Sequence, residues 1–219
     1  MSDSSHLLPN GRIERYSFRE RLMHWTASVS YVYLLLSGLA FWTPALFWLA
    51  ALLGGGTLAR IVHPYVGVVF FLAVLWMYSV WASQMRASEE DRGWWKAMGH
   101  YVRNEDEQVP PEGRFNAGQK SLFWGFLWCG LVLLVTGVIL WVPNWIPWDL
   151  RILRLLAVIL HPIAALMTIA LFMIHLYMGL AVERGALRSM TRGDVSRAWA
   201  AKHHRAWYSR LLGSTSAKE

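Results

Sequence analysis

The chain has 219 residues, of which 55% are apolar and only 16% are charged. About a quarter of the residues are charged in a typical soluble domain of this length, so the composition argues against an ordinary soluble protein. The formal net charge of +7 would suit nucleic acid. However, the basic residues are confined to a few polar segments, and we expect no nucleic-acid partner.

Four long segments contain no Asp, Glu, Lys or Arg: residues 25–59, 61–85, 121–148 and 155–182. A helix needs about 20 mainly apolar residues to cross a hydrocarbon core of about 30 Å, and each segment is long enough. The sequence therefore predicts an all-α integral membrane protein, a four-helix bundle. The predicted helices cover about residues 24–43, 63–83, 121–142 and 154–182.

The first helix is expected to act as an uncleaved signal anchor, because residues 1–23 are polar. The second is predicted to begin at His63–Pro64, since proline is tolerated in a first turn. A loop at residues 84–120 follows it. The third helix is predicted to stop before Pro143. Residues 1–183 would then form the membrane domain and residues 184–219 a basic tail, where His203 and His204 are expected at the surface.

The basic residues predict the orientation of the chain. Of 21 Lys and Arg residues, 18 lie before Trp25, in the loop at 84–120, or in the tail. An even number of crossings puts these three segments on one side, which the positive-inside rule assigns to the cytoplasm. We expect a multi-pass protein of the bacterial inner membrane with both termini cytoplasmic and basic segments touching membrane lipid.

Four histidines lie in or at the ends of the predicted membrane helices: His24, His63, His161 and His175. Ionisable residues at membrane depth are costly and are usually functional. The helix directions place His24 near the inner face and His63 near the outer face. His161 and His175 are separated by about 21 Å along one helix and by about 40° around it, so they share one side. We therefore expect the pairs His63–His161 (outer) and His24–His175 (inner).

Two axial histidines from facing helices are the ligands of a low-spin electron-transfer haem. Bundle cores commonly hold such sites between facing side chains. A zinc site would need four clustered ligands, whereas these lie in two separated pairs. The sequence predicts two b-type haems, whose iron is bound by the four histidines. Arg21, close to His24, and Arg60, close to His63, are candidates for binding the haem propionates. They could equally orient the helix ends.

Several segments resemble a known family, in order and over nearly the whole chain: Arg21–Trp25, Arg60–Pro64, Phe115–Lys120, His161, Ile174–Met178 and Lys202–Tyr208. They are similar to the gamma subunit, a membrane di-haem cytochrome b, of respiratory formate dehydrogenase. The Asn-Ala-Gly-Gln-Lys stretch at residues 116–120 and the tail segment are fairly specific to that family. The four histidines alone are also found in related di-haem proteins.

The resemblance implies the same haem pairs, His63–His161 outside and His24–His175 inside. It implies that an iron–sulfur subunit delivers electrons to the outer haem and that the inner haem reduces a quinone near the cytoplasmic face. A separate catalytic subunit with molybdenum or tungsten oxidises formate, so this chain serves electron transport and no residue is expected to touch formate. Asn116 and Gln119 would line the quinone pocket. From the residues alone, a helix cap is the commoner role of such an Asn.

Three alternatives remain open at this point. The chain could be the cytochrome b subunit of a membrane nickel–iron hydrogenase or of a related oxidoreductase. It could be a transporter that uses intramembrane histidines as proton relays. It could also be a purely structural anchor for a peripheral enzyme, in which case replacing His161 or His175 would leave electron flow unchanged.

Overall fold

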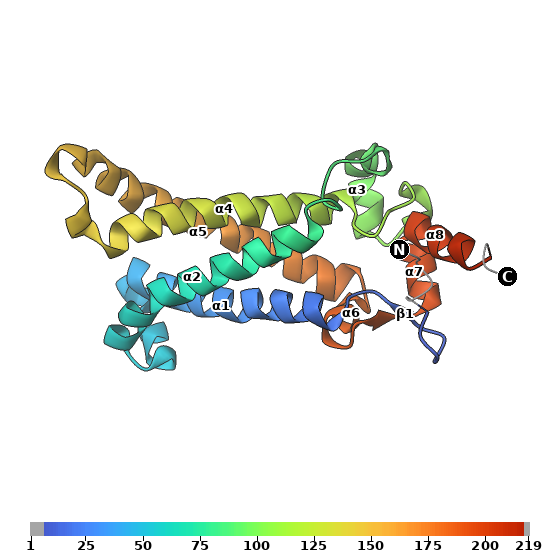
Figure 1. Cartoon of the computed structure of the whole chain (residues 1–219), viewed down its shortest axis with the longest axis horizontal. Coiled ribbons are helices and arrows are strands. Elements are labelled where there is room, and N and C mark those ends of the chain that lie inside the picture. The colour runs from blue at the N-terminus through green and yellow to red at the C-terminus, as the bar shows by residue number, and fades with distance from the viewer. Residues whose placement is uncertain (1–6, 217–219) are drawn as a thin grey trace. The chain divides into compact units, whose positions relative to one another are not determined.

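The computed structural model describes residues 7–216 and is mostly helical. Within these described residues, four helices are long and apolar enough to cross a membrane. They are the four longest α-helices in Figure 1: α1 (Phe18–Trp42), α2 (Gly56–Trp81), α4 (Ala117–Trp141) and α5 (Arg151–Tyr177). The predicted all-α fold with four membrane helices is confirmed.

Shorter elements connect and extend these helices. Among the described residues they are β1 (Ile13–Glu14), η2 (Pro44–Leu53), η3 (Glu89–Asp91), α3 (Trp94–Val102), η4 (Asp106–Gln108), η5 (Pro143–Trp145), η6 (Trp148–Leu150), the π-helix η7 (Met178–Val182), α6 (Ala186–Thr191), β2 (Asp194–Val195), α7 (Arg197–His203) and α8 (Arg205–Ser216). Strands β1 and β2 pair antiparallel, with Ile13 opposite Val195.

The predicted helix starts at residues 24, 63, 121 and 154 are wrong, because every long helix begins earlier. Local capping explains the early start of α1. The Ser17 backbone N–H donates to Glu20 Oε2 at 2.8 Å, and the Glu20 backbone N–H donates to Ser17 Oγ at 3.3 Å. This reciprocal pair is a capping box. The absence of charge marks the hydrocarbon-spanning part of a helix, whereas the helix itself continues into its polar first turn.

Helix α2 begins directly after two glycines in left-handed conformation, Gly54 (φ 84°) and Gly55 (φ 100°), which end the preceding helical segment η2. Pro64 consequently lies inside α2 and not in its first turn. Pro162 lies inside α5 in the same way, directly after His161. Each proline lacks an N–H group, so each helix loses one backbone hydrogen bond near a candidate ligand.

The chain divides into two compact units. One, here called the membrane unit, comprises Met23–Ser79 and Gly125–Phe172. The other, here called the terminal unit, comprises the described residues of Met1–Leu22, Val80–Trp124 and Met173–Glu219. The separation into a domain at 1–183 and a tail at 184–219 stays a prediction, and residues 1–6 and 217–219 of it lie outside the described residues.

The membrane unit packs around Tyr31 of α1. Its ring centroid lies 4.9 Å from that of Phe172, 5.9 Å from that of Phe70 and 6.0 Å from that of Phe126. The Tyr31 hydroxyl donates to Thr168 Oγ1 at 3.3 Å, so its polar end is satisfied inside the bundle. This cluster therefore joins residues of all four membrane helices.

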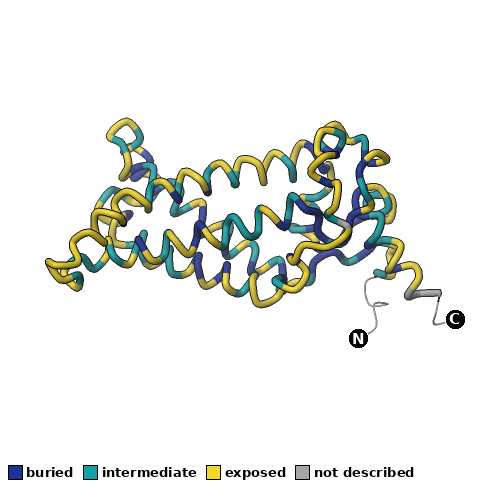
Figure 2. The backbone as a smooth tube through the Cα atoms, turned by 90° about the horizontal axis from the view of Figure 1, so that it is seen from above, coloured by how far each residue is buried: buried dark blue, intermediate teal, exposed yellow. Residues whose placement is uncertain are grey.

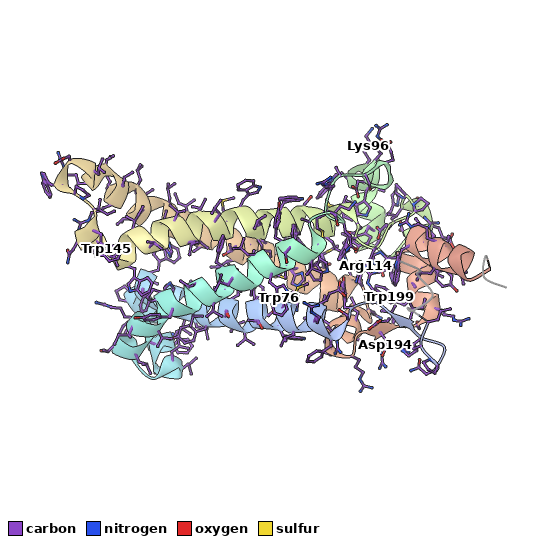
Figure 3. All side chains as sticks on the ribbon, in the orientation of Figure 1. Trp76, Lys96, Arg114, Trp145, Asp194 and Trp199 are labelled. Carbon is purple, nitrogen blue, oxygen red and sulfur yellow. The ribbon has the colours of Figure 1, made fainter. Side chains whose placement is uncertain are left out.

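Many outward side chains along the membrane helices are large and apolar. Val29 of α1 is 68% exposed and Leu72 of α2 is 58% exposed, and exposed residues recur along these helices in Figure 2. Trp145 and Trp148, in the connection between α4 and α5, are also exposed, and Figure 3 shows the Trp145 side chain pointing outward. Apolar faces bordered by tryptophan are typical of membrane helices.

Two apolar clusters lie among the described residues of the terminal unit. One gathers Trp94 and Tyr101 of α3 against Val109, Ala117 and Val182. The other joins the N-terminal strand to the C-terminal helices through Ile13, Val195, Ala200, Trp207 and Leu211. Residues predicted to form a tail are thus folded together with β1.

The surface positions predicted for His203 and His204 are wrong, because both side chains are buried. His203 Nδ1 lies 2.9 Å from Asp106 Oδ1, and His204 Nδ1 donates to Gly113 O at 2.7 Å. These partners compensate for the lost hydration of the two rings.

Candidate functional site

Two of the four predicted histidine ligands face each other in the membrane unit. His63 of α2 and His161 of α5 have ring centroids 6.4 Å apart, with ring planes inclined at 59°. A metal–imidazole bond is about 2 Å long, so two imidazoles on one iron have ring centres about 6 Å apart. The spacing of these rings fits a shared metal, and these are the two histidines that the sequence predicted as ligands of the outer haem.

Each of these histidines is held by a hydroxyl from the neighbouring helix. Ser37 Oγ of α1 lies 2.6 Å from His63 Nδ1, and Thr136 Oγ1 of α4 lies 2.9 Å from His161 Nδ1. With Nδ1 engaged, Nε2 is the nitrogen available to a metal. Two such nitrogens, one from each ring, would fit a haem iron held between two histidines.

A glycine follows each hydroxyl residue, and both glycines lie against the histidine rings. A methyl group at Gly38 would meet His63 Cε1 at 4.0 Å, and one at Gly137 would meet His161 Cε1 at 3.3 Å. The first distance is ordinary contact, whereas the second is tighter than most carbon contacts. Gly137 thus leaves space that the ring of His161 uses.

Sequence reasoning missed these four residues, although a signal was present. Ser37–Gly38 precedes His63–Pro64 on the next helix, and Thr136–Gly137 precedes His161–Pro162 on the next helix. The two helix hairpins therefore carry the same pattern, a hydroxyl residue and glycine followed by histidine and proline. A search for internal repeats at the level of whole segments does not detect a pattern of four positions.

The inner pair is distributed over the two units. His24 belongs to the membrane unit, where its ring lies 5.6 Å from that of Trp25. His175 belongs to the terminal unit and is exposed. The pairing of His24 with His175 stays a prediction.

The two predicted propionate partners have different surroundings. Arg21 belongs to the terminal unit, and its Nη1 donates to Thr191 O at 2.9 Å. Arg60 lies in the second turn of α2 and is exposed. Their role toward propionates also stays a prediction.

The predicted quinone residues, Asn116 and Gln119, form the start of α4. Gln119 N–H donates to Asn116 Oδ1 at 2.9 Å, and Asn116 N–H donates to Gln119 Oε1 at 3.1 Å. This is a capping box. Gly118, between them, allows close packing, because a methyl group there would lie 2.7 Å from a ring carbon of Trp94. The family-like stretch at 116–120 therefore has a structural role at this helix start.

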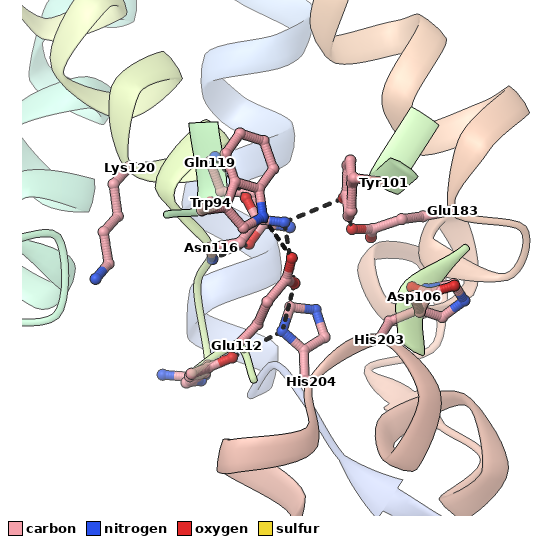
Figure 4. Close-up of polar contacts among 12 residues, drawn as sticks. Trp94, Tyr101, Asp106, Glu112, Asn116, Gln119, Lys120, Glu183, His203 and His204 are labelled. Atoms are coloured by element: carbon pink, nitrogen blue, oxygen red, sulfur yellow. Dashed lines mark hydrogen bonds and ion pairs between the residues drawn. The ribbon is translucent and has the colours of Figure 1, made fainter. Parts of the chain in front are cut away.

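The amide of Asn116 also joins a buried polar network in the terminal unit (Figure 4). Its Nδ2 donates to Tyr101 Oη at 3.1 Å and to Glu112 Oε2 at 3.2 Å. Tyr101 in turn donates to Glu183. Both N–H groups of Asn116 are thus engaged. In the part of the chain that the structure describes, Gln119 Nε2 has no hydrogen-bond partner.

Glu112 is the most perturbed carboxyl of this network. It is 5% exposed and accepts from Trp94 Nε1 at 2.5 Å. Burial raises the pKa of Glu112 to about 8, with further contributions from the negative charges of Glu183 and Asp106. Burial likewise raises the pKa of Tyr101, which therefore remains a donor at neutral pH.

Arg15 fixes the protonation of His204 beside this network. The Arg15 guanidinium Nη2 lies 3.0 Å from His204 Nε2, and guanidinium groups only donate. His204 Nε2 must therefore accept, which leaves the proton on Nδ1 for Gly113 O. Burial and the Arg15 charge hold the pKa of His204 well below its usual range, so this histidine is neutral.

Comparison of the whole chain with known proteins identifies its family. Residues 15–193 match the family model described as prokaryotic cytochrome b561. The chain belongs to this family. The cytochrome b556(fdo) subunit of formate dehydrogenase from Escherichia coli strain K12 is 37% identical over 207 residues, which cover 94% of this chain and 96% of that subunit.

Two further relatives are also cytochrome subunits of formate dehydrogenases. The nitrate-inducible cytochrome b556(Fdn) subunit of formate dehydrogenase from the same strain is 33% identical over 208 residues, 94% of this chain and 95% of that subunit. The formate dehydrogenase cytochrome b556 subunit of Haemophilus influenzae is 31% identical over 198 residues, 90% and 82% of the two chains. This cytochrome b561 family member is a multi-pass inner-membrane electron-transport protein that binds haem b.

Proposed function

We propose that this chain is the membrane cytochrome b subunit of a respiratory formate dehydrogenase. In that complex it carries electrons from an iron–sulfur subunit, through two b-type haems with two histidine ligands each, to a quinone near the cytoplasmic face. The facing pair of His63 and His161 is the observation that carries this proposal. The names of the relatives support the choice of complex.

A haem held between His63 and His161 would supply a one-electron carrier, with no iron position left open for oxygen chemistry. Hydroxyls of neighbouring helices contact the two rings of the outer pair, and the Phe41 ring centroid lies 5.5 Å from that of His63. His24 and His175 are proposed to bind the inner haem. Arg21 and Arg60 are proposed to neutralise propionates.

We place the quinone site beside Asn116 and Gln119. The Asn116 amide already donates to Tyr101 and Glu112. Gln119 Nε2 is therefore the better candidate for a donor to a quinone carbonyl oxygen. The orientation predicted from the basic residues, with both termini in the cytoplasm, would let the quinone take its protons from the cytoplasmic side.

The partners proposed for the complex are the iron–sulfur subunit and a catalytic subunit with molybdenum or tungsten, which oxidises formate. Purification of the tagged chain from its native membrane, followed by identification of the attached subunits, tests this assignment. Formate dehydrogenase subunits are the expected result. Recovery of hydrogenase subunits instead would overturn the choice of complex and leave the cytochrome intact.

The number of haems is tested by a pyridine haemochrome assay on the purified chain. Two haem b groups per chain are expected, and one group would contradict the inner pair. A His175→Ala variant is expected to retain one haem.

The quinone site is tested by kinetics of the complex. Gln119→Ala should raise the apparent KM for quinone more than Asn116→Ser does, and an unchanged KM in both variants would contradict this placement.

A further inference from the structure

The strongest unassigned feature is the pair of buried hydroxyls behind the outer histidines. Ser37 has no exposed surface and Thr136 is 5% exposed, so water cannot replace either group. Ser37 lies on α1 and contacts the histidine of α2, whereas Thr136 lies on α4 and contacts the histidine of α5. Two different helix hairpins thus provide the same arrangement.

The direction of these hydrogen bonds follows from the other contacts of the hydroxyls. Ser37 Oγ donates to Tyr33 O at 2.8 Å, and Thr136 Oγ1 donates to Val132 O at 2.6 Å. A hydroxyl has one proton, so its oxygen is left to accept from the histidine. A neutral imidazole that binds iron through Nε2 carries its proton on Nδ1, which matches this arrangement.

We propose that Ser37 and Thr136 are positioning residues of the outer haem site. Their oxygens accept from Nδ1–H of His63 and His161, fix the rotation of the two rings, and increase the donor strength of each Nε2. This inference rests on the proposed binding of haem by this histidine pair. It assigns a role to residues outside the ligand set.

The physical consequence is a shift of redox potential. An acceptor at Nδ1–H makes the imidazole a stronger base, and a stronger base stabilises the oxidised iron. Loss of a partner beyond the ligands changes metal affinity about 10- to 100-fold. Because the acceptors here are neutral hydroxyls, we expect the low end of this range. A tenfold change in the preference for oxidised over reduced iron equals about 59 mV for one electron.

The chain offers a matched control on α1. Ser30 is 7% exposed, and its Oγ donates to Thr26 O at 2.8 Å, the same bond to the fourth preceding carbonyl. Among the described residues, Ser30 makes no hydrogen bond with a histidine. Ser30→Ala therefore reproduces the helical change of Ser37→Ala without the contact to His63.

The test uses the purified chain with its haem. Ser37→Ala and Thr136→Val are compared with wild type, Ser30→Ala, and the conservative variants Ser37→Thr and Thr136→Ser. The measurements are haem per chain, the midpoint potential of each haem by optical redox titration, and the g values of the oxidised haems. Alanine is a better helix former than serine, and valine has the shape of threonine, so folding is expected to persist.

We expect one haem potential to rise in both Ser37→Ala and Thr136→Val, with changed g values, and to stay at the wild-type value in Ser30→Ala. Thr136→Ser should restore most of the wild-type potential. Potentials and g values equal to wild type in both hydroxyl variants would overturn the inference while leaving the haem site itself intact. Absence of haem from the wild-type chain would instead overturn the proposed function.

If Ser37→Ala or Thr136→Val loses haem entirely, the conservative variant at the same position tests the proposal. Retention of haem with a shifted potential in Thr136→Ser or Ser37→Thr supports positioning by the hydroxyl. Loss of haem in both the hydroxyl-free and the conservative variant, with Ser30→Ala unchanged, would contradict a role for the hydroxyl and indicate a requirement for the exact side-chain volume.

Discussion

The membrane unit and the terminal unit satisfy their buried polar groups with different chemistry. Around His63 and His161, the partners are neutral hydroxyls whose protons return to the backbone. In the terminal unit, the buried groups include Arg15, Glu112 and Glu183. Charged side chains are costly inside hydrocarbon, whereas outside it they can be buried with hydrogen-bond partners. Position relative to the membrane thus determines which residues can build a polar site.

The largest expected effect concerns space in the membrane unit. Gly137→Leu should eliminate haem from the His63–His161 site, because even a methyl group at this position lies 3.3 Å from the His161 ring. Haem per chain, measured by pyridine haemochrome, checks it. Gly38→Ala is the matched control, since its methyl group would lie 4.0 Å from the His63 ring and should be tolerated. Full haem content in Gly137→Leu would show that this glycine is not required.

The corresponding change in the terminal unit should reduce stability without removing outer haem. Gly118→Ala places a methyl group 2.7 Å from the ring of Trp94, and such overpacking costs about 1–3 kcal/mol. Thermal unfolding followed by tryptophan fluorescence measures it. Gly99→Ala in α3 is the control, because its nearest neighbour would be the end of the flexible Arg103 side chain at 3.8 Å. An unfolding midpoint equal to that of wild type would contradict the packing at Gly118.

A smaller effect should separate the units by pH. The folded-state pKa of Glu112 is raised to about 8, above the ordinary value of 4.5. The protonated form is therefore favoured by folding, and stability is lost progressively as pH rises from about 4.5 to about 8, above which the loss is complete. Between pH 6.5 and 8 the loss should reach about 1–2 kcal/mol, at a limit of 1.36 kcal/mol per pH unit.

His204 does not obscure this window. Its pKa is lowered, so its contribution to stability is complete above about pH 6.5 and is lost only at lower pH. Glu112→Gln should remove the fall in unfolding free energy between pH 6.5 and 8 and keep the hydrogen bond from Trp94, whereas its amide nitrogen cannot accept from Asn116. A variant with the same fall as wild type would show that another group titrates there.

The smallest effect is expected for exposed charge. Glu89 and Arg92 form an ion pair at 2.8 Å, but their side chains are 78% and 79% exposed. Glu89→Gln should change the free energy of unfolding by less than about 0.5 kcal/mol, because water and salt screen such pairs. Chemical denaturation measures it. A change as large as that of Gly118→Ala would mean that exposed charges contribute to the terminal unit as strongly as buried packing does.

The sequence predicted the four membrane helices because hydrophobic length depends only on composition along the chain. Helix direction led to the predicted pairing of His63 with His161; their rings face each other, and the binding of haem by this pair stays a prediction. The sequence did not predict the helix starts, since these depend on local capping by Ser17–Glu20 and on the left-handed glycines at 54 and 55.

The sequence also did not predict the side-chain contacts between segments that are distant in the chain. Ser37, near the end of α1, and His63, near the start of α2, are 26 residues apart in the chain, and nothing in composition shows that they touch. His204 looked like a surface residue because its neighbours are polar, yet Arg15, far away in the chain, and Gly113 bury and satisfy it. Predictions from one sequence are strongest for properties of single segments and weakest for partners from different segments.

The most direct test of the account counts haem in three variants of the purified chain: His63→Ala, His161→Ala and the double variant. If these residues bind one haem from opposite sides, each single variant loses one haem per chain and the double variant loses no more. A double variant that loses twice as much haem, or a single variant that keeps all of it, would contradict the shared site.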